Sequence, residues 1–424
     1  MKKICLSVIG LYLTFLSAFA QTGTESTTGY KSKPLKVDEI NLVESYYKQD
    51  GNHSPVTGGI GTEKVTDLSN GLEVKWLGYD ASGNKHELML GMGIDHHSSA
   101  SAAFVSKTGA SKTDGNRIYP SLSWTKENEA KGTQFGLGGY YSYEYNYQSL
   151  GMDMHMAAKT KNGGEFNAKV SGFFDKVKLI LPSELIPVPV VNTNTAATVT
   201  SYTTASGRTV YLSSGGTVIA STSNTIPSSP RNTFTASLSF AQIINKRMQV
   251  SIATDLVAQH GYLGLPFHRV YFTDGTEKVE NLPDNRVKVP IGIRLNYFLG
   301  DNFIIRSYYR FYTDNWGITA HTASLEIPYK FTPFFSLSPF FRWYTQTASP
   351  YFAAYGKHST SDKYYTSNYA YSAFTSYFMG LGSHIAPPKG IFNTHLSTLE
   401  IRYGHYTQST DLYSNVLSFA FTFK

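Results

Sequence analysis

The chain has 424 residues, of which 41% are hydrophobic and only 16% are charged, and its formal net charge is +7. The charged fraction is low for a soluble domain, and a single cysteine, Cys5, rules out a disulfide scaffold. The modest positive charge comes with no nucleic-acid-binding motif, so no nucleic-acid partner is expected.

Residues 1–20, MKKICLSVIGLYLTFLSAFA, have the pattern of a secretory signal peptide. Lys2 and Lys3 precede an apolar run, and Ala18-Phe19-Ala20 is a small-x-small cleavage site. The run is short for a membrane anchor, so we expect cleavage and export. Residues 21–36 are polar and are expected to form a flexible segment. No later apolar stretch is long enough for a spanning helix, so any membrane crossing must be made by strands.

Beyond this segment, apolar and small polar residues alternate in runs of about ten residues. The stretch FTASLSFAQIINKRMQVSIATDL (234–256) is typical, because two alternating runs flank a short polar break, as in a β-hairpin. We expect about sixteen strands, with roughly 14 to 18 compatible with the pattern. They are placed at residues 38–47, 70–78, 86–95, 117–126, 133–147, 150–160, 165–177, 231–243, 248–259, 286–299, 302–313, 316–330, 334–346, 366–383, 395–407 and 412–424.

Short and long connections alternate along the chain. The long ones are 48–69, 96–116, 178–230, 260–285 and 347–365. This alternation is typical of a transmembrane antiparallel up-and-down β-barrel with long outer loops and short periplasmic turns. The sequence therefore predicts an all-β protein whose residues 37–424 form one barrel in the outer membrane of a Gram-negative bacterium.

The two faces of the predicted strands differ in chemistry. One face is rich in Phe, Leu and Tyr, and the other consists mainly of Ser, Thr, Gly and Asn. Lipid on the apolar face and a wetter interior explain both faces, whereas a soluble sandwich is the alternative. Within the barrel, residues 187–230 form a Thr- and Ser-rich insertion, which we expect to be mobile and extracellular. Thr209–Ala220 reads as a small hairpin inside it.

Several stretches resemble one family. They include GIDHHSSAS (93–101), GLPFHRVYFTDG (264–275), YYRFYTDNWGITAHTASLEIPYKF (308–331) and LEIRYGHY (399–406). They are similar to domain-of-unknown-function family 3570, exported barrel-like proteins found largely in Bacteroidota. The resemblance implies an outer-membrane location and no assigned activity. Phe423 resembles the terminal aromatic residue that the outer-membrane assembly machinery recognises.

Two groups of residues could carry chemistry in the outer loops. Asp50 and His53 lie in the first loop, and Asp95 and His96 lie at the start of the second. Imidazole and carboxylate groups are ligands for Zn or Cu, so a metal ion at these loops is one hypothesis. Ordinary turn chemistry is the alternative. No other cofactor is expected.

A set of charged residues is expected on the inward face and should line the lumen. A basic-leaning lumen selects anions, whereas charges that pair across the interior would simply fill it. The set is Glu144, Lys288, Arg294, Arg306, Arg310, Glu326, Arg342, Glu400 and Arg402.

The sequence contains no motif of a known enzyme class, so no enzymatic activity is expected. We expect a porin-like conduit, or a transport or export channel, for small solutes, with anions as one candidate class. The alternative is a non-conducting barrel plugged by loops 48–69 and 260–285, which anchors periplasmic or surface partners such as an extracytoplasmic electron-transfer lipoprotein. Outer-membrane lipid is a partner in either case.

Overall fold

The structure is a computed structural model of the chain, and it describes residues 32–98, 115–182, 185, 200–203, 209–212, 218–221 and 227–424. The predicted signal peptide lies outside these residues, as does most of the insertion 187–230, so both stay predictions.

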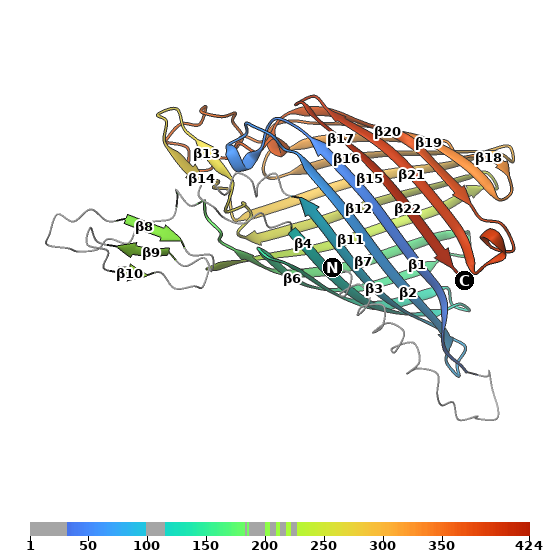
Figure 1. Cartoon of the computed structure of the whole chain (residues 1–424). Helices are drawn as coiled ribbons and strands as arrows, with labels where there is room; N and C mark the ends of the chain where they lie inside the picture. Colours follow the sequence, from blue (N-terminus) through green and yellow to red (C-terminus); the bar gives the residue numbers. More distant parts are fainter. Residues whose placement is uncertain are drawn as a thin grey trace.

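One antiparallel sheet closes on itself to form a barrel (Figure 1). Its seventeen strands occupy sixteen positions around the ring, because β17 and β18 are two segments of one strand that is interrupted at Ile327-Pro328. The strands are β1 (Lys33–Asp50), β2 (Val65–Tyr79), β3 (Lys85–Ser98), β4 (Gly115–Asn128), β5 (Thr133–Glu144), β6 (Tyr147–Lys159), β7 (Gly164–Lys178), β11 (Ser228–Asn245), β12 (Met248–Gly261), β15 (Asn285–Leu299), β16 (Phe303–Asp314), β17 (Thr319–Glu326), β18 (Tyr329–Thr332), β19 (Phe335–Gln346), β20 (Phe374–Ile385), β21 (Leu396–Gln408) and β22 (Leu412–Phe423).

The first and last strands close the ring. Ile40 of β1 lies opposite Phe423 of β22, and the pairing continues without a shift to Asp50 opposite Tyr413. The predicted fold class, an antiparallel up-and-down barrel of about sixteen strands, is therefore confirmed.

The outer surface is a continuous apolar band. Large hydrophobic side chains remain about half exposed on it, including Leu137, Met152, Phe234 and Leu256 at 47%, 55%, 50% and 54%. A soluble protein rarely exposes so large an apolar surface. The period-2 pattern of the sequence thus places its apolar face outside the ring and its polar face inside.

The two ends of the barrel differ. One end, here the short-turn rim, has connections such as 129–132, 160–163 and 246–247. The other, here the long-loop rim, carries 51–64, 262–284 and 347–373. The long-loop connections contain the short elements η1 (Pro55–Thr57), β13 (Arg269–Tyr271), β14 (Glu277–Val279) and η3 (Tyr369–Tyr371). The short element η4 (Ile391–Asn393) lies between β20 and β21, on the short-turn rim.

No helix within the described residues has the length and apolar character needed to cross a bilayer.

Several boundaries differ from the sequence prediction, and three of them change how a segment is assigned. The barrel includes Lys33, since Lys33 already pairs with Tyr79, so residues 33–36 belong to a strand and not to the flexible segment expected there. A two-residue turn, Tyr145-Asn146, splits the run predicted for 133–147, because the alternation of tyrosines continues through it. Strand β20 begins at Phe374 rather than at 366, because residues 366–373 belong to a loop.

The hairpin predicted within the insertion is present. Strands β9 (Thr209–Leu212) and β10 (Val218–Ser221) pair antiparallel, and β8 (Thr200–Thr203) adds a third strand. This small sheet lies beyond the long-loop rim (Figure 1).

The β2–β3 turn on the short-turn rim provides a test of this local structure. The carboxylate of Asp80 accepts hydrogen bonds from the backbone N–H of Ser82 and Asn84, both at 2.9 Å, and from the Asn84 amide at 2.8 Å. The Asn84 hydrogen bonds hold the pKa of Asp80 well below its usual range.

We therefore expect Asp80→Ala to lower the unfolding midpoint in urea at pH 7. A depressed folded-state pKa stabilises the fold above the unfolded value of about 3.9 and loses that effect as the pH falls further. The difference in unfolding midpoint between the wild type and the variant should therefore become smaller as the pH falls below about 4. The control is Glu129→Ala in the β4–β5 turn, and an equal, pH-independent effect of both changes would contradict the prediction.

Candidate functional site

Three loops of the long-loop rim pack against one another. They are residues 51–64, 262–284 and 347–373, here called the cap. Two β-bridges join its second and third loops, Phe272 with His358 and Asn281 with Tyr365. Each bridge is hydrogen-bonded, with Thr273 N–H donating to the His358 carbonyl at 2.9 Å. The second and third loops therefore form one structure, although they are separate in the sequence.

The cap buries apolar side chains of its own. Val270 is fully buried and Phe272 is 2% exposed, and the Phe272 ring lies 4.9 Å from that of Tyr365. The buried Arg269 guanidinium donates from Nη1 to the carbonyl of Val56 at 2.6 Å, which ties the second loop to the first. The cap is thus held by packing and by a charge-assisted hydrogen bond.

A buried carboxylate links the second and third loops. Glu280 is 5% exposed and accepts hydrogen bonds from the Leu265 N–H at 2.9 Å and from the Thr366 hydroxyl. His268 Nδ1 lies 3.6 Å from the same carboxylate. Burial, together with the charge of Glu280, raises the pKa of Tyr262.

Two glycines allow the first loop to approach the others closely. Gly58 and Gly59 have φ of +80° and +88°, which disfavours any other residue. A Cβ on Gly58 would lie 2.5 Å from the Tyr271 ring, and one on Gly59 would lie 2.5 Å from the Ser367 carbonyl oxygen. The glycines of this loop thus serve its folding into the barrel mouth.

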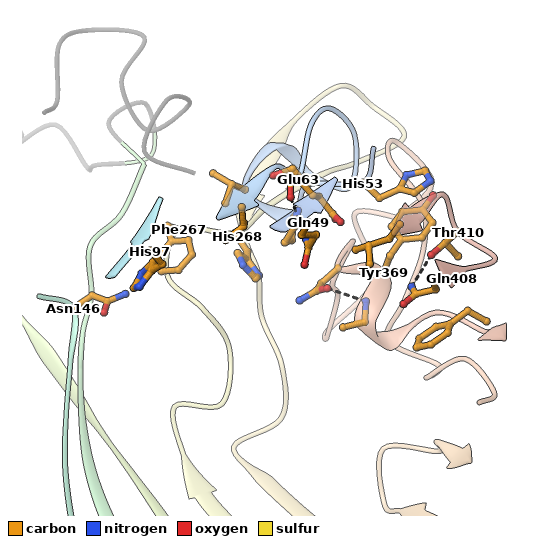
Figure 2. A pocket seen from close by; sticks show the side chains of 18 of the residues that line it. Gln49, His53, Glu63, His97, Asn146, Phe267, His268, Tyr369, Gln408 and Thr410 are labelled. Atoms are coloured by element: carbon orange, nitrogen blue, oxygen red, sulfur yellow. Dashed lines mark hydrogen bonds between the residues drawn. The ribbon is translucent and has the colours of Figure 1, made fainter. Parts of the chain in front are cut away.

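The cap extends across the mouth. In the closed ring β12 stands eight strands from β1, half of the circumference, and the second loop leaves from β12. Phe267 of this loop nevertheless shares a cavity of about 460 Å³ with Gln49 of β1, His97 of β3 and Gln408 of β21 (Figure 2). Glu63 also lines it, and burial raises the pKa of its carboxyl.

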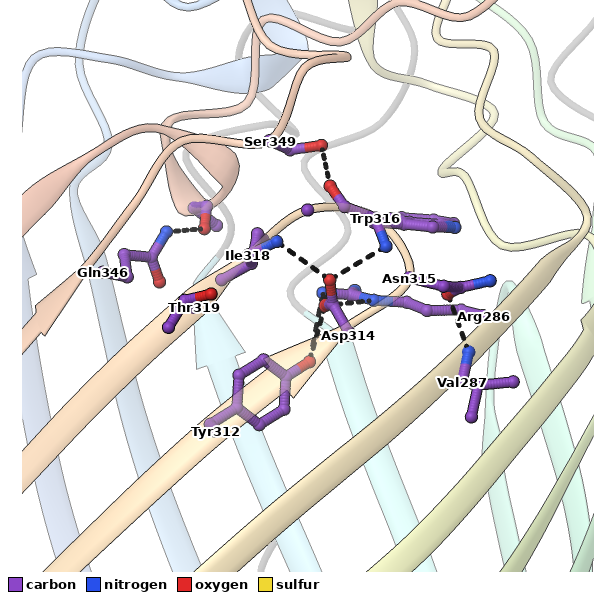
Figure 3. A network of polar contacts seen from close by, with 12 residues as sticks. Arg286, Val287, Tyr312, Asp314, Asn315, Trp316, Ile318, Thr319, Gln346 and Ser349 are labelled. Carbon is purple, nitrogen blue, oxygen red and sulfur yellow. Dashed lines mark hydrogen bonds and ion pairs between the residues drawn. The ribbon is translucent and has the colours of Figure 1, made fainter.

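A network in the wall supports the cap from below (Figure 3). The Asp314 carboxylate accepts hydrogen bonds from the Tyr312 hydroxyl at 2.7 Å and from the N–H groups of Trp316 and Ile318 at 2.9 and 3.0 Å. Arg286 Nε donates to it at 3.0 Å. Breaking such a buried pair by removing one partner costs about 3–5 kcal/mol, so this part of the rim is fixed.

Trp316 connects that network to the cap. Its indole is 1% exposed, and the Arg286 guanidinium lies over the ring at 4.4 Å. The Ser349 hydroxyl of the third loop donates to the Trp316 carbonyl at 2.8 Å. The alternation in the sequence predicts a strand that includes 316 and gives no sign of this role, although Asp314-Asn315-Trp316-Gly317 contains the turn formers Asp, Asn and Gly.

The barrel interior away from the cap is hollow. The side chains of Arg306 and Arg402 face inward yet are 50% and 43% exposed. A Cβ added to the inward-facing Gly71 would meet no atom within 4 Å. Side chains therefore leave open space inside the ring, as expected for sixteen strands.

The strand registers place every residue of the predicted lumen set on the inward face. These residues are Glu144, Lys288, Arg294, Arg306, Arg310, Glu326, Arg342, Glu400 and Arg402.

Part of this set forms ion pairs. Glu326 bridges two arginines, with its oxygens 3.1 Å from Arg306 Nη1 and 2.7 Å from Arg402 Nη2. Glu144 and Glu400 lie 3.3 and 3.8 Å from histidine nitrogens, of His97 and His384 respectively. The sequence left open whether these charges select anions or pair with one another. For these residues, the structure favours pairing inside the barrel.

Three arginines of the set have no carboxylate partner within the part of the chain that the structure describes. Arg294 and Arg342 lie over aromatic rings, at 5.5 and 5.1 Å from the ring centres of Tyr308 and Phe378. Arg310 Nε is buried without a hydrogen-bond partner. The wall from β15 to β19 thus carries an excess of positive charge.

The predicted metal ligands are not brought together. Asp95 and His96 are neighbours on β3 rather than in a loop, so they point to opposite faces, and His96 faces outward and contacts Asn116. Asp50 accepts from Tyr413, and His53 is stacked on Tyr369. The described residues contain no group of three or more His, Cys, Asp or Glu that could hold a metal ion. Metal binding by a smaller set stays a prediction.

We expect Gly59→Ala to loosen the cap. The added Cβ collides with a backbone oxygen that cannot rotate away, and overpacking costs about 1–3 kcal/mol. Backbone amides of the second and third loops should then exchange their hydrogens roughly tenfold faster than in the wild type. Hydrogen exchange of the folded barrel, measured by mass spectrometry, checks this. Gly275→Ala is the control, because Gly275 has φ +83° but no atom within 4 Å of its Cβ position. Unchanged exchange in Gly59→Ala would show that the loops are not interlocked.

The solved structures that align with this chain share little sequence identity with it. CdiB from Acinetobacter baumannii aligns at 7% identity and a TM-score of 0.44, over 91% of this chain and 60% of that protein, so the chain spans about three fifths of it. OccK5 (OpdH) from Pseudomonas aeruginosa aligns at 8% identity and a TM-score of 0.40, over 92% and 98%. A bacterial polysaccharide outer membrane secretin aligns at 9% and 0.43, over 91% and 98%.

No curated protein matches the sequence. Residues 97–415 match the family described as "Protein of unknown function (DUF3570)". These residues make up most of the chain and include the second and third cap loops, Trp316 and the arginines of the wall. The chain belongs to this family.

Proposed function

We propose that the protein is a porin-like conduit of the outer membrane for small anionic solutes, with its outer mouth closed by the cap. The observation that carries this proposal is the position of the arginines. Arg294, Arg310 and Arg342 face a hollow interior without carboxylate partners, and a wall of unpaired positive charge favours anions in a water-filled pore.

The cap supports a gated rather than a permanently open conduit. Its loops reach from one side of the ring to the other and bury their own apolar core. A solute would pass only when the cap moves or along the cavity between the cap and the strands. We orient the barrel with its long loops outside, so the cap faces the cell exterior. The start of β1 and the end of β22 then lie on the periplasmic side.

A second candidate is a non-conducting barrel that anchors a periplasmic or surface partner. The buried apolar side chains of the cap favour it, since a permanently fixed cap would block passage. The two candidates differ in what happens when the cap is removed.

Replacing residues 266–281 by a short Gly-Ser linker removes most of the second loop and leaves every strand of the ring intact. In planar bilayers we expect the wild type to give small or rare current steps and this variant to give steady steps several-fold larger. Folding is checked separately, by the shift in gel mobility of an unheated barrel. A folded variant that carries no current would favour the anchoring candidate.

Selectivity tests the arginines independently of the cap. In the cap-deleted background, replacing Arg294, Arg310 and Arg342 together by Gln should lower the anion-to-cation permeability ratio, since it removes the unpaired positive charges of the wall. A matched control replaces Lys246, Arg247 and Lys389 by Gln, three cations in turns of the short-turn rim. Equal ratios in the two triple variants would exclude the wall as the selectivity element.

A further inference from the structure

One acidic residue occupies the apolar outer face far from either rim. Glu44 of β1 points outward, because the inward side chains of this strand are the odd-numbered ones from Asn41 to Gln49. It is exposed, and Leu42 and Tyr46 are its outward neighbours along the strand. The described residues provide no hydrogen-bond or ion-pair partner for it.

The strand registers place Glu44 near mid-height of the wall. Strands in a barrel are tilted against its axis. Residues that lie opposite one another on successive strands therefore form a row whose height in the wall changes steadily around the barrel. The row through Glu44 reaches the short-turn rim four strands away on one side and the long-loop rim four strands away on the other. It runs through Leu337, Ser383, Ile401, Phe419, Glu44, Asn70, Ile94, Ile118 and Tyr143.

The position is unusual within this barrel. On the described strands, the other Lys, Arg, Asp and Glu side chains of the outward face lie within a few residues of a strand end, such as Lys48, Lys126 and Lys176. An acidic group in hydrocarbon is costly unless it finds a hydrogen-bonding partner, and such residues in membrane proteins mark functional contacts.

Asn70 completes a self-complementary pattern. It lies directly opposite Glu44 on β2 and points outward as well. The pair therefore presents a carboxyl acceptor and an amide donor side by side, with apolar residues such as Leu68 and Phe419 around them. A second copy related by a two-fold axis along the membrane normal would place its Asn70 against Glu44, and its Glu44 against Asn70.

We propose that the protein forms a symmetric dimer in the membrane through the outward faces of β1 and β2, with Glu44 of each copy hydrogen-bonded to Asn70 of the other. The two reciprocal hydrogen bonds remove the polar groups from lipid, and the flanking apolar residues pack across the interface. The proposal does not depend on conduction through the barrel.

Thiol crosslinking locates the interface. Cys5 is the only cysteine of the chain and is replaced by Ala in every variant. Leu68→Cys, beside Asn70, should give a covalent dimer with a short bis-maleimide in dilute lipid vesicles. The control, Leu256→Cys, is equally outward-facing but lies on β12, on the opposite side of the ring. No dimer from Leu68→Cys, or equal yields from both positions, would overturn the proposal.

Substitution of Glu44 tests the polar pair itself. Glu44→Gln keeps a side chain that can hydrogen-bond with Asn70 and should dimerise like the parent. Glu44→Leu removes both reciprocal hydrogen bonds and should raise the dissociation constant of the dimer in vesicles roughly tenfold, as expected for two such bonds in a membrane. Dimerisation of Glu44→Leu at parental strength would overturn the proposal, as would a parent that is monomeric or bound only to a different protein.

Discussion

Closure of the hydrogen-bonded ring is the constraint on which the rest of the structure depends. Within hydrocarbon, each unpaired backbone N–H or C=O costs several kcal/mol, so a sheet can cross only if it has no free edge. The register of β1 against β22, from Ile40–Phe423 to Asp50–Tyr413, provides that closure. Once the ring is closed, alternate residues must face either the outside or the interior, and the apolar and polar faces of the sequence acquire fixed positions.

This constraint explains why so much of the fold is predictable from the sequence. Closure requires alternation with a period of two in every strand, so each of the sixteen strand positions can be recognised in the sequence. Each of the sixteen predicted strands lies near the observed one. The errors occur where that signal is uninformative. Tyr143, Tyr145 and Tyr147 keep the alternation across a tight turn, and residues 366–373 resemble a strand although Thr366 and Ser367 are buried in the cap.

The site was less predictable, for a physical reason. The cap is built from contacts between segments some 80 to 200 residues apart, such as Arg269 with Val56 and Glu280 with Thr366. Such contacts have no period, and each loop alone reads as ordinary turn chemistry. The sequence did indicate, as the plugged-barrel alternative, that loops 48–69 and 260–285 fold inward, and it predicted that the arginines face the lumen. It could not indicate the third loop's part, or the support that Trp316 provides.

The interior and the cap together determine how passage would be controlled. A ring of sixteen strands leaves a lumen that side chains of ordinary size do not fill, and the half-exposed Arg306 and Arg402 are consistent with this. The wall therefore cannot close the pathway by itself, and closure falls to the cap. Because Arg269, Glu280 and the bridge at Phe272 connect all three loops, one loop cannot move aside without breaking buried contacts of the others. If the barrel conducts as proposed, opening would therefore displace the three loops together.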